Sequence, residues 1–163
     1  FSAGTGSTEP TLVPLLIALM NCLISLLAVL IIDRTGRRFL ALCSSSVMFL
    51  SSIALITSFV FDWRVMAIVS ILAFVGAFGF GLGPVPWLMT TEVFPTFAVS
   101  SAVSFAVALN WTTNWVASTI FPLQQVILKD FAFVPYSICI FLFFLFSWFI
   151  LPETKGRPVA FVD

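Results

Sequence analysis

Two asparagines one helical turn apart are the side chains best placed for chemistry in this sequence. Asn110 and Asn114 stand at positions i and i+4, with Trp111 between them, so on a helix the two amides share a face. An amide donates and accepts hydrogen bonds and an indole ring packs on C–H surfaces, which together suit a polyol. The same amides also suit a hydrogen-bond network between helices, and the residues alone leave both roles open.

A third amide, Asn21, interrupts an apolar segment. It belongs to a stripe of small and polar residues spaced three and four apart, namely Pro14, Ala18, Asn21, Ser25 and Ala28. Such a stripe is typical of a helix face that packs on protein and not on lipid. Asn21 is therefore either a hydrogen-bonding residue between helices or a ligand contact.

A run of glycines and prolines between Gly79 and Trp87 predicts a break in a helix. Pro84 and Pro86 each lack an N–H and clash with the preceding turn, so two backbone donors are lost within three residues. Gly83, Pro84 and Pro86 are accordingly predicted to form a hinge or gate, and a purely structural kink is the alternative. Gly79 and Gly83 also have the spacing of a close helix contact.

The charged side chains expected on the cytoplasmic side lie in three places: Asp33 to Arg38, Glu92, and Glu153 to Arg157. One interpretation is a network of ion pairs that holds one conformation and breaks in another. The other is simple anchoring of the chain at a membrane surface. The residues concerned are Arg34, Arg37, Arg38, Glu92, Glu153 and Arg157.

The composition excludes most classes of protein. Of 163 residues, 61% are hydrophobic and 9% charged, the net charge is zero, and there is no histidine. A soluble domain carries far more charge, and a nucleic-acid partner requires a basic surface. Without histidine, and with three scattered cysteines, we expect no metal site, no cofactor and no catalytic residue, and so no enzyme. An integral membrane protein remains.

The charges divide the chain into uncharged intervals long enough to span a bilayer. A charge at the bilayer centre costs roughly 2.5–3.5 kcal/mol, so long intervals without charge indicate segments that cross the membrane. We predict an all-α, polytopic membrane bundle of five transmembrane helices in a single domain over 1–163. Gln124 and Gln125 are expected to form a polar tail after the fourth span. The expected spans are 10–32, 39–61, 65–91, 97–121 and 131–151, followed by a cytoplasmic tail at 152–163.

The distribution of lysine and arginine predicts the orientation. One side of the bundle holds Arg34, Arg37, Arg38, Lys155 and Arg157, and the other holds Arg64 and Lys129. The first side should be cytoplasmic, which places the N-terminus of this chain outside and its C-terminus inside. Because the chain begins at Phe1 on the outer side, we expect a preceding segment to carry it across the membrane.

Taken in order, the motifs resemble the sugar porter family of the major facilitator superfamily, which includes the facilitative glucose transporters. The similarity covers nearly the whole chain and corresponds to helices eight to twelve of twelve, within the C-terminal half. It implies an alternating-access carrier that holds a hexose-type sugar between two six-helix halves. The matching segments are Asp33-Arg-Thr-Gly-Arg-Arg38, Gly83-Pro-Val-Pro-Trp87, Glu92-Val-Phe-Pro95, Asn110-Trp111 with Asn114, and Pro152-Glu-Thr-Lys-Gly-Arg157.

The resemblance also implies roles for individual residues. The implied sugar contacts are Asn21, Trp87, Asn110, Trp111 and Asn114. The implied cytoplasmic charge network, which favours the outward-facing state, includes Arg37, Arg38, Glu92 and Glu153. The implied partners are a sugar, membrane lipid and the N-terminal half of the carrier. The plasma membrane is the expected location, with an organelle membrane as the alternative.

Two departures from the family pattern limit these implications. The seventh helix, which supplies much of the sugar's hydrogen bonding in the family, has no counterpart in this sequence. Gly79 occupies a position where some glucose transporters carry a sugar-contacting glutamate, so the sugar's identity stays open. The alternative function is a truncated or receptor-like membrane protein without transport activity of its own.

Overall fold

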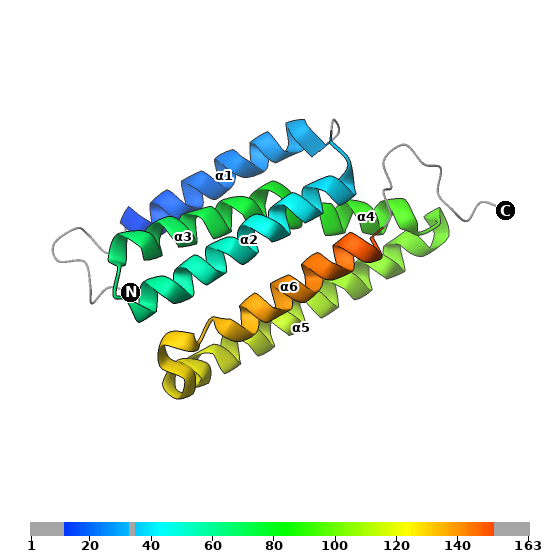
Figure 1. The fold of residues 1–163 in the computed structure, drawn as a ribbon. Coiled ribbons are helices and arrows are strands. Elements are labelled where there is room, and N and C mark those ends of the chain that lie inside the picture. The colour runs from blue at the N-terminus through cyan, green and yellow to red at the C-terminus, as the bar shows by residue number, and fades with distance from the viewer. Residues whose placement is uncertain (1–11, 33–34, 152–163) are drawn as a thin grey trace.

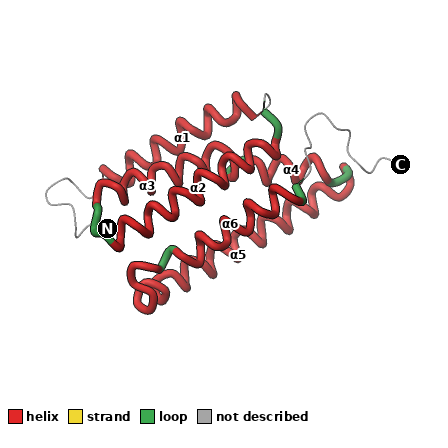
Figure 2. Tube along the Cα trace, in the orientation of Figure 1, coloured by secondary structure: helices red, strands yellow, loops and turns green. Residues whose placement is uncertain are grey.

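The computed structural model describes residues 12–32 and 35–151, and nearly all of these are helical (Figure 1). No strand occurs among the described residues, and only short loops join the helices (Figure 2). The predicted all-α membrane bundle is confirmed. Its elements are α1 (Leu12–Ile32), α2 (Arg37–Val60), α3 (Arg64–Ala77), the π-helical segment η1 (Phe78–Leu82), α4 (Val85–Val93), α5 (Thr96–Leu128), the 3-10 turn η2 (Lys129–Phe131) and α6 (Val134–Phe149).

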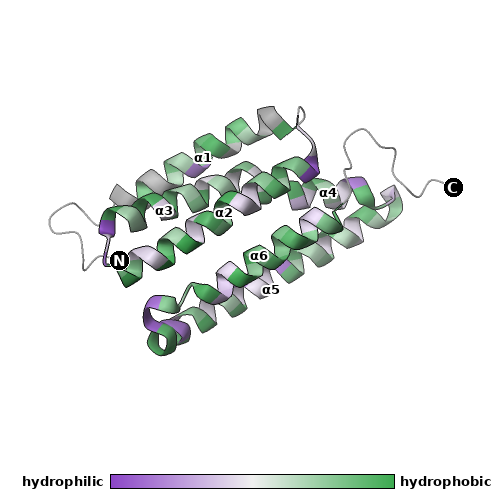
Figure 3. Cartoon of the chain, in the orientation of Figure 1, coloured by the Kyte–Doolittle hydropathy of each residue, from purple (hydrophilic) through white to green (hydrophobic). Residues whose placement is uncertain are grey.

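These elements form five rods, because α3, η1 and α4 follow one another as a single broken rod. Arg37–Val60 and Arg64–Val93 are each long and apolar enough to cross a membrane. Helices α5 and α6 pass the same test as a pair, Thr96–Phe131 with Val134–Phe149, joined by a 91° bend. Hydrophilic residues concentrate near the ends of the rods (Figure 3).

The fourth rod differs from its predicted form at its C-terminal end. Helix α5 continues to Leu128, so Gln124 and Gln125 are helical and do not form a separate polar tail. Pro122 lies inside this helix without ending it. The helix stops only at Lys129, whose φ of 48° is incompatible with a further helical turn. The exposed polar groups of Gln125 and Lys129 therefore belong to the end of a long helix.

The turn between α2 and α3 is a compact helix C-cap. Asp62 has a φ of 53°, a left-handed conformation that aspartate tolerates better than most residues. The backbone N–H of Trp63 donates to the carbonyl of Ser58 at 2.9 Å, and that of Asp62 donates to Phe59 at 3.4 Å. This is the Schellman pattern of hydrogen bonds, which satisfies the last carbonyls of a helix. It lets α3 return directly along α2.

Helix α2 is the centre of the described bundle, because α3, α6 and η1 all pack on it. Nine of its residues are buried and five of these are serines, small enough to let neighbouring helices approach closely. A cluster of Ile32, Leu40, Ala41 and Val85 joins the ends of α1, α2 and α4. Helix α5, in contrast, buries none of its described side chains.

Candidate functional site

The predicted helix break is present in the third rod. The backbone N–H of Gly83 donates to the carbonyl of Phe78 at 2.7 Å, which is the i→i+5 spacing of a π-helical turn. The chain then turns at Gly83 and Pro84, and α4 begins at Val85. Pro86 falls in the first turn of α4, where a backbone N–H has no acceptor within the helix, so the missing N–H of proline breaks no helical hydrogen bond. A π-helical turn inside a longer helix often marks a functional position.

Trp87 follows this break directly, within the first turn of α4. Its side chain is 38% exposed, so the indole is open on one side. Helix α4 contacts both η1 and α5. The break therefore determines where Trp87 stands relative to the helix that carries the two asparagines.

The two asparagines of α5 interact, as their spacing predicts. Asn114 Nδ2 donates to the main-chain oxygen of Asn110 at 2.9 Å and to its side-chain Oδ1 at 3.2 Å. Both residues are exposed, and Trp111 between them is 70% exposed. Within the described part of the chain, the side-chain N–H groups of Asn110 and the side-chain oxygen of Asn114 make no hydrogen bond and are open to a ligand or to another protein segment.

The polar stripe of α1 is only partly buried. Ala28 is fully buried and Ala18 is exposed, while Asn21 is half-buried and has an interaction partner. The side chains of Pro14 and Ser25 lie outside the described residues. Helix α1 packs on α3 and η1, and a Cβ placed on Gly76 would lie 3.0 Å from Ile24 Cδ1. Asn21 therefore belongs to the helix that lies against the broken rod.

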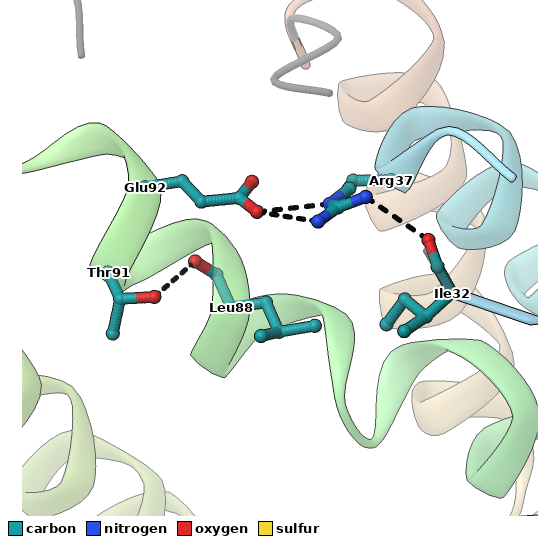
Figure 4. Close-up of polar contacts among 5 residues, drawn as sticks. All are labelled: Ile32, Arg37, Leu88, Thr91 and Glu92. Carbon is teal, nitrogen blue, oxygen red and sulfur yellow. Dashed lines mark hydrogen bonds and ion pairs between the residues drawn. The ribbon is translucent and has the colours of Figure 1, made fainter. Parts of the chain in front are cut away.

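Arg37 joins three helices at one end of the bundle (Figure 4). Its Nη2 and Nε donate to Glu92 Oε1 on α4, at 2.8 and 3.1 Å. Its Nη1 donates to the carbonyl of Ile32, the last residue of α1, at 3.1 Å. The two side chains are 13% and 28% exposed, so this ion pair is partly shielded from water.

Arg38 reaches a fourth helix. Its Nη2 donates to the main-chain oxygen of Trp148 near the end of α6. A cation is unfavourable at the N-terminus of its own helix and favourable at the C-terminus of another. Arg37 and Arg38 begin α2 but bind the C-terminal carbonyls of α1 and α6, so their placement reflects contacts between helices. Arg34, Glu153 and Arg157 lie outside the described residues.

Sequence reasoning missed two features of this region. The third rod approaches α2 closely at Gly81, where an added Cβ would lie 2.5 Å from Ser44 Cβ, and Gly81 was not one of the predicted pair Gly79 and Gly83. The hydroxyl of Ser44 contacts the backbone of that rod. The run Ser44-Ser45-Ser46 was the available signal, but it does not say which hydroxyl leaves its own helix.

The apolar, helical architecture defines a multi-pass membrane protein, and comparison with known proteins identifies its family. The family model described as "Sugar (and other) transporter" matches residues 1–163. The chain therefore belongs to the sugar transporter family of the major facilitator superfamily, and the resemblance seen in its motifs is confirmed.

Individual relatives agree with this assignment. The chain is 30% identical to the facilitated glucose transporter member 3 of Oryctolagus cuniculus over 157 residues, covering 93% of this chain and 32% of the relative. It is 30% identical over 166 residues to the D-xylose-proton symporter-like 1 of Arabidopsis thaliana, covering 100% of this chain and 32% of the relative. The chain thus spans about one third of the length of these relatives.

Solved structures of related transporters have the same fold. The inward-open xylose transporter XylE from E. coli matches with a TM-score of 0.84 at 30% identity, covering 90% of this chain and 34% of that protein. The proton:xylose symporter XylE bound to 6-bromo-6-deoxy-D-glucose matches with a TM-score of 0.86 at 28% identity. That match covers 97% of this chain and 35% of the symporter.

Proposed function

We propose that this chain forms the C-terminal part of a longer carrier that moves a hexose-type sugar across a membrane by alternating access. The observation that carries the proposal is the Asn110–Asn114 pair. These amides are exposed on an apolar helix that buries none of its described side chains. Uncompensated amides are costly in lipid, so this face of α5 requires a polar cavity or another protein segment.

The chemistry of the pair suits a sugar. Asn110 offers N–H donors and Asn114 offers a carbonyl acceptor, which matches hydroxyl groups that both donate and accept. The exposed indoles of Trp87 and Trp111 provide flat apolar surfaces for the C–H face of a pyranose ring. With Asn21 on α1, these residues are the proposed sugar contacts.

The broken rod and the charge cluster are proposed to serve the conformational cycle. Gly83, Pro84 and Pro86 form the hinge at which α4 changes its angle to α3. Arg37 holds the ends of α2 and α4 together through Glu92 and reaches the end of α1 through the carbonyl of Ile32. The ion pair must break if α2 and α4 separate at this end. Arg34, Arg38, Glu153 and Arg157 complete the proposed network on the cytoplasmic side.

We also propose an orientation, a membrane and a partner for this chain. The N-terminus of this chain lies outside and its C-terminus lies in the cytoplasm, as the excess of arginine and lysine on one side favours. The plasma membrane is the proposed location. The partner of α5 is the N-terminal half of the carrier, which agrees with relatives about three times as long as this chain.

Sugar uptake by the full-length protein tests the site. We expect Asn114→Ala and Trp87→Ala to lower kcat/KM for the transported sugar by roughly tenfold, because each removes one or two hydrogen bonds or a stacking surface. Uptake of labelled glucose and xylose is measured in transporter-deficient cells at equal surface expression. Thr119→Ala is the control, because this hydroxyl donates only to the carbonyl of Trp115 on its own helix. Unchanged uptake by both site variants would refute the site.

A further inference from the structure

We propose that Ser44 is a positioning residue for the broken rod. Its hydroxyl fixes the π-helical turn of η1 against α2, and so fixes the position of α4 and of Trp87. The effect on transport rests on the proposed function, whereas the structural effect does not. Three features of the structure support this role: the contacts of the Ser44 hydroxyl, the close approach at Gly81 and the contrast with the neighbouring Ser45.

The Ser44 hydroxyl bridges both partners of a π-helical turn. It donates to the carbonyl of Ala77 at 2.6 Å and accepts the N–H of Leu82 at 3.2 Å. Ala77 and Leu82 are five residues apart, which is the spacing of a π-helical hydrogen bond. The sulfur of Met48 lies farther away, at 3.8 Å, so the single hydroxyl proton serves Ala77. One side chain of α2 thus supplies a donor and an acceptor where the ladder of the third rod is distorted.

Gly81 makes this contact possible. An added Cβ would lie 2.5 Å from Ser44 Cβ and 2.8 Å from the main-chain oxygen of Leu40, so only glycine allows the rod to come this close to α2. Both residues are buried, and Ser44 is 2% exposed. Loss of the hydroxyl removes one hydrogen-bond partner from the Ala77 carbonyl and one from the Leu82 N–H.

Ser45 provides a matched contrast on the same helix. It is as deeply buried as Ser44, but its hydroxyl donates only to Ala41 and Leu42, within α2. Side chains of serine can replace missing backbone partners in a distorted membrane helix. Ser44 contacts the backbone of η1 in this way and Ser45 does not. Substitutions at the two positions therefore distinguish the effect of holding the break from the effect of losing a buried hydroxyl.

The consequence concerns Trp87. It follows the π-helical turn by five residues, and between them lie Gly83 and Pro84, where the chain passes from the π-helical turn into α4. If Ser44 releases the turn, α4 gains freedom relative to α2 and the indole loses its fixed position. We therefore expect loss of the hydroxyl to weaken sugar binding more than it lowers the maximal rate.

Hydrogen–deuterium exchange of the full-length protein in lipid nanodiscs tests the structural part. We expect Ser44→Ala to increase the exchange rate of the 78–83 backbone amides roughly three- to tenfold, the effect of one lost hydrogen bond. Ser45→Ala should leave these amides unchanged. If Ser44→Ala gives too little protein, Ser44→Cys, with its weaker donor, should show a smaller increase in the same amides. Equal exchange in the wild type and the Ser44 variant would overturn the proposal, as would an equal increase in both serine variants.

Transport kinetics of the same variants test the functional part. Ser44→Ala should raise the KM for the transported sugar at least threefold, with less change in maximal rate, and Ser45→Ala should change neither. Unchanged KM with faster exchange would overturn the positioning of Trp87. If the wild type transports no sugar while the exchange difference persists, the proposed function fails and the role of Ser44 in the broken rod stands.

Discussion

At the scale of residues, one guanidinium joins three helices. Arg37 binds a carboxylate on α4 and the terminal carbonyl of α1 while it begins α2 itself. A lysine ammonium is a single point charge and cannot direct planar donors to both partners at once. The arrangement explains why arginine, and not merely positive charge, occupies this position.

A double-mutant cycle on Arg37 and Glu92 measures this contact. We expect Arg37→Ala and Glu92→Ala each to lower the unfolding free energy of the full-length protein, with a coupling energy of about 1–2 kcal/mol between them. The partial shielding of the pair is the physical reason for a value above that of exposed ion pairs. Unfolding in detergent mixtures provides the measurement. A coupling energy near zero would contradict the prediction.

A second prediction at this scale concerns Asp62, which adopts a left-handed backbone conformation at the end of α2. Glycine takes this conformation without steric cost, so Asp62→Gly should stabilise the protein by about 0.5–1 kcal/mol. Asp62→Val should destabilise it, because a β-branched residue fits that conformation poorly. Melting temperatures of the two variants should therefore shift in opposite directions, and shifts of the same sign would contradict the assignment of the turn.

At the scale of elements, the third rod shows what sequence could and could not predict. Two prolines separated by one residue were enough to predict a break near Pro84, because the loss of backbone donors is a local property. The packing of that break was not predictable. Whether Gly79, Gly81 or Gly83 faces α2 depends on the rotation of two helices, which a π-helical turn itself changes. The acceptors of Arg37 and Arg38 are main-chain carbonyls, which carry no sequence signal.

The glycines of this rod give a prediction at the element scale. Gly81→Ala should destabilise the full-length protein by about 1–3 kcal/mol, because its Cβ would meet the backbone oxygen of Leu40 and the Cβ of Ser44. Gly76→Ala is the control, since its Cβ would meet only the flexible side-chain ends of Ile24 and Met20. Thermal unfolding of both variants measures the difference. Equal losses would show that η1 does not approach α2 as described.

At the scale of the whole molecule, charge spacing and hydropathy predicted the class and the order of the rods. The predicted end of the fourth helix was wrong, because Gln124 and Gln125 were taken to lie beyond it, although glutamine is well tolerated within helices. A shared site for the proposed sugar contacts was not predictable from spacing, since Asn21, Trp87 and Asn114 lie on three different rods. Only their residue types and the motif order indicated a shared role.

The orientation of the molecule can be tested by labelling. In a full-length protein with Cys22, Cys43 and Cys139 replaced, Asp62→Cys should react with a membrane-impermeant maleimide on intact cells. Thr96→Cys, at the start of α5, should react only after permeabilisation. Both positions are exposed, and the excess of arginine and lysine predicts that they face opposite sides. Reaction of both variants in intact cells would contradict the predicted orientation.

The contacts of Arg37 and Arg38 also describe a sequence of events during synthesis. The carbonyl of Ile32 is only five residues from Arg37 along the chain, so this partner is made before Arg37 itself. Its carboxylate partner Glu92 is made 55 residues later, which at ribosomal rates of about 5–20 residues per second is a delay of several seconds. The acceptor of Arg38 is separated by 110 residues. Neither long-range contact can form before its later helix has been made, so Arg37 and Arg38 gain their partners on α4 and α6 in that order.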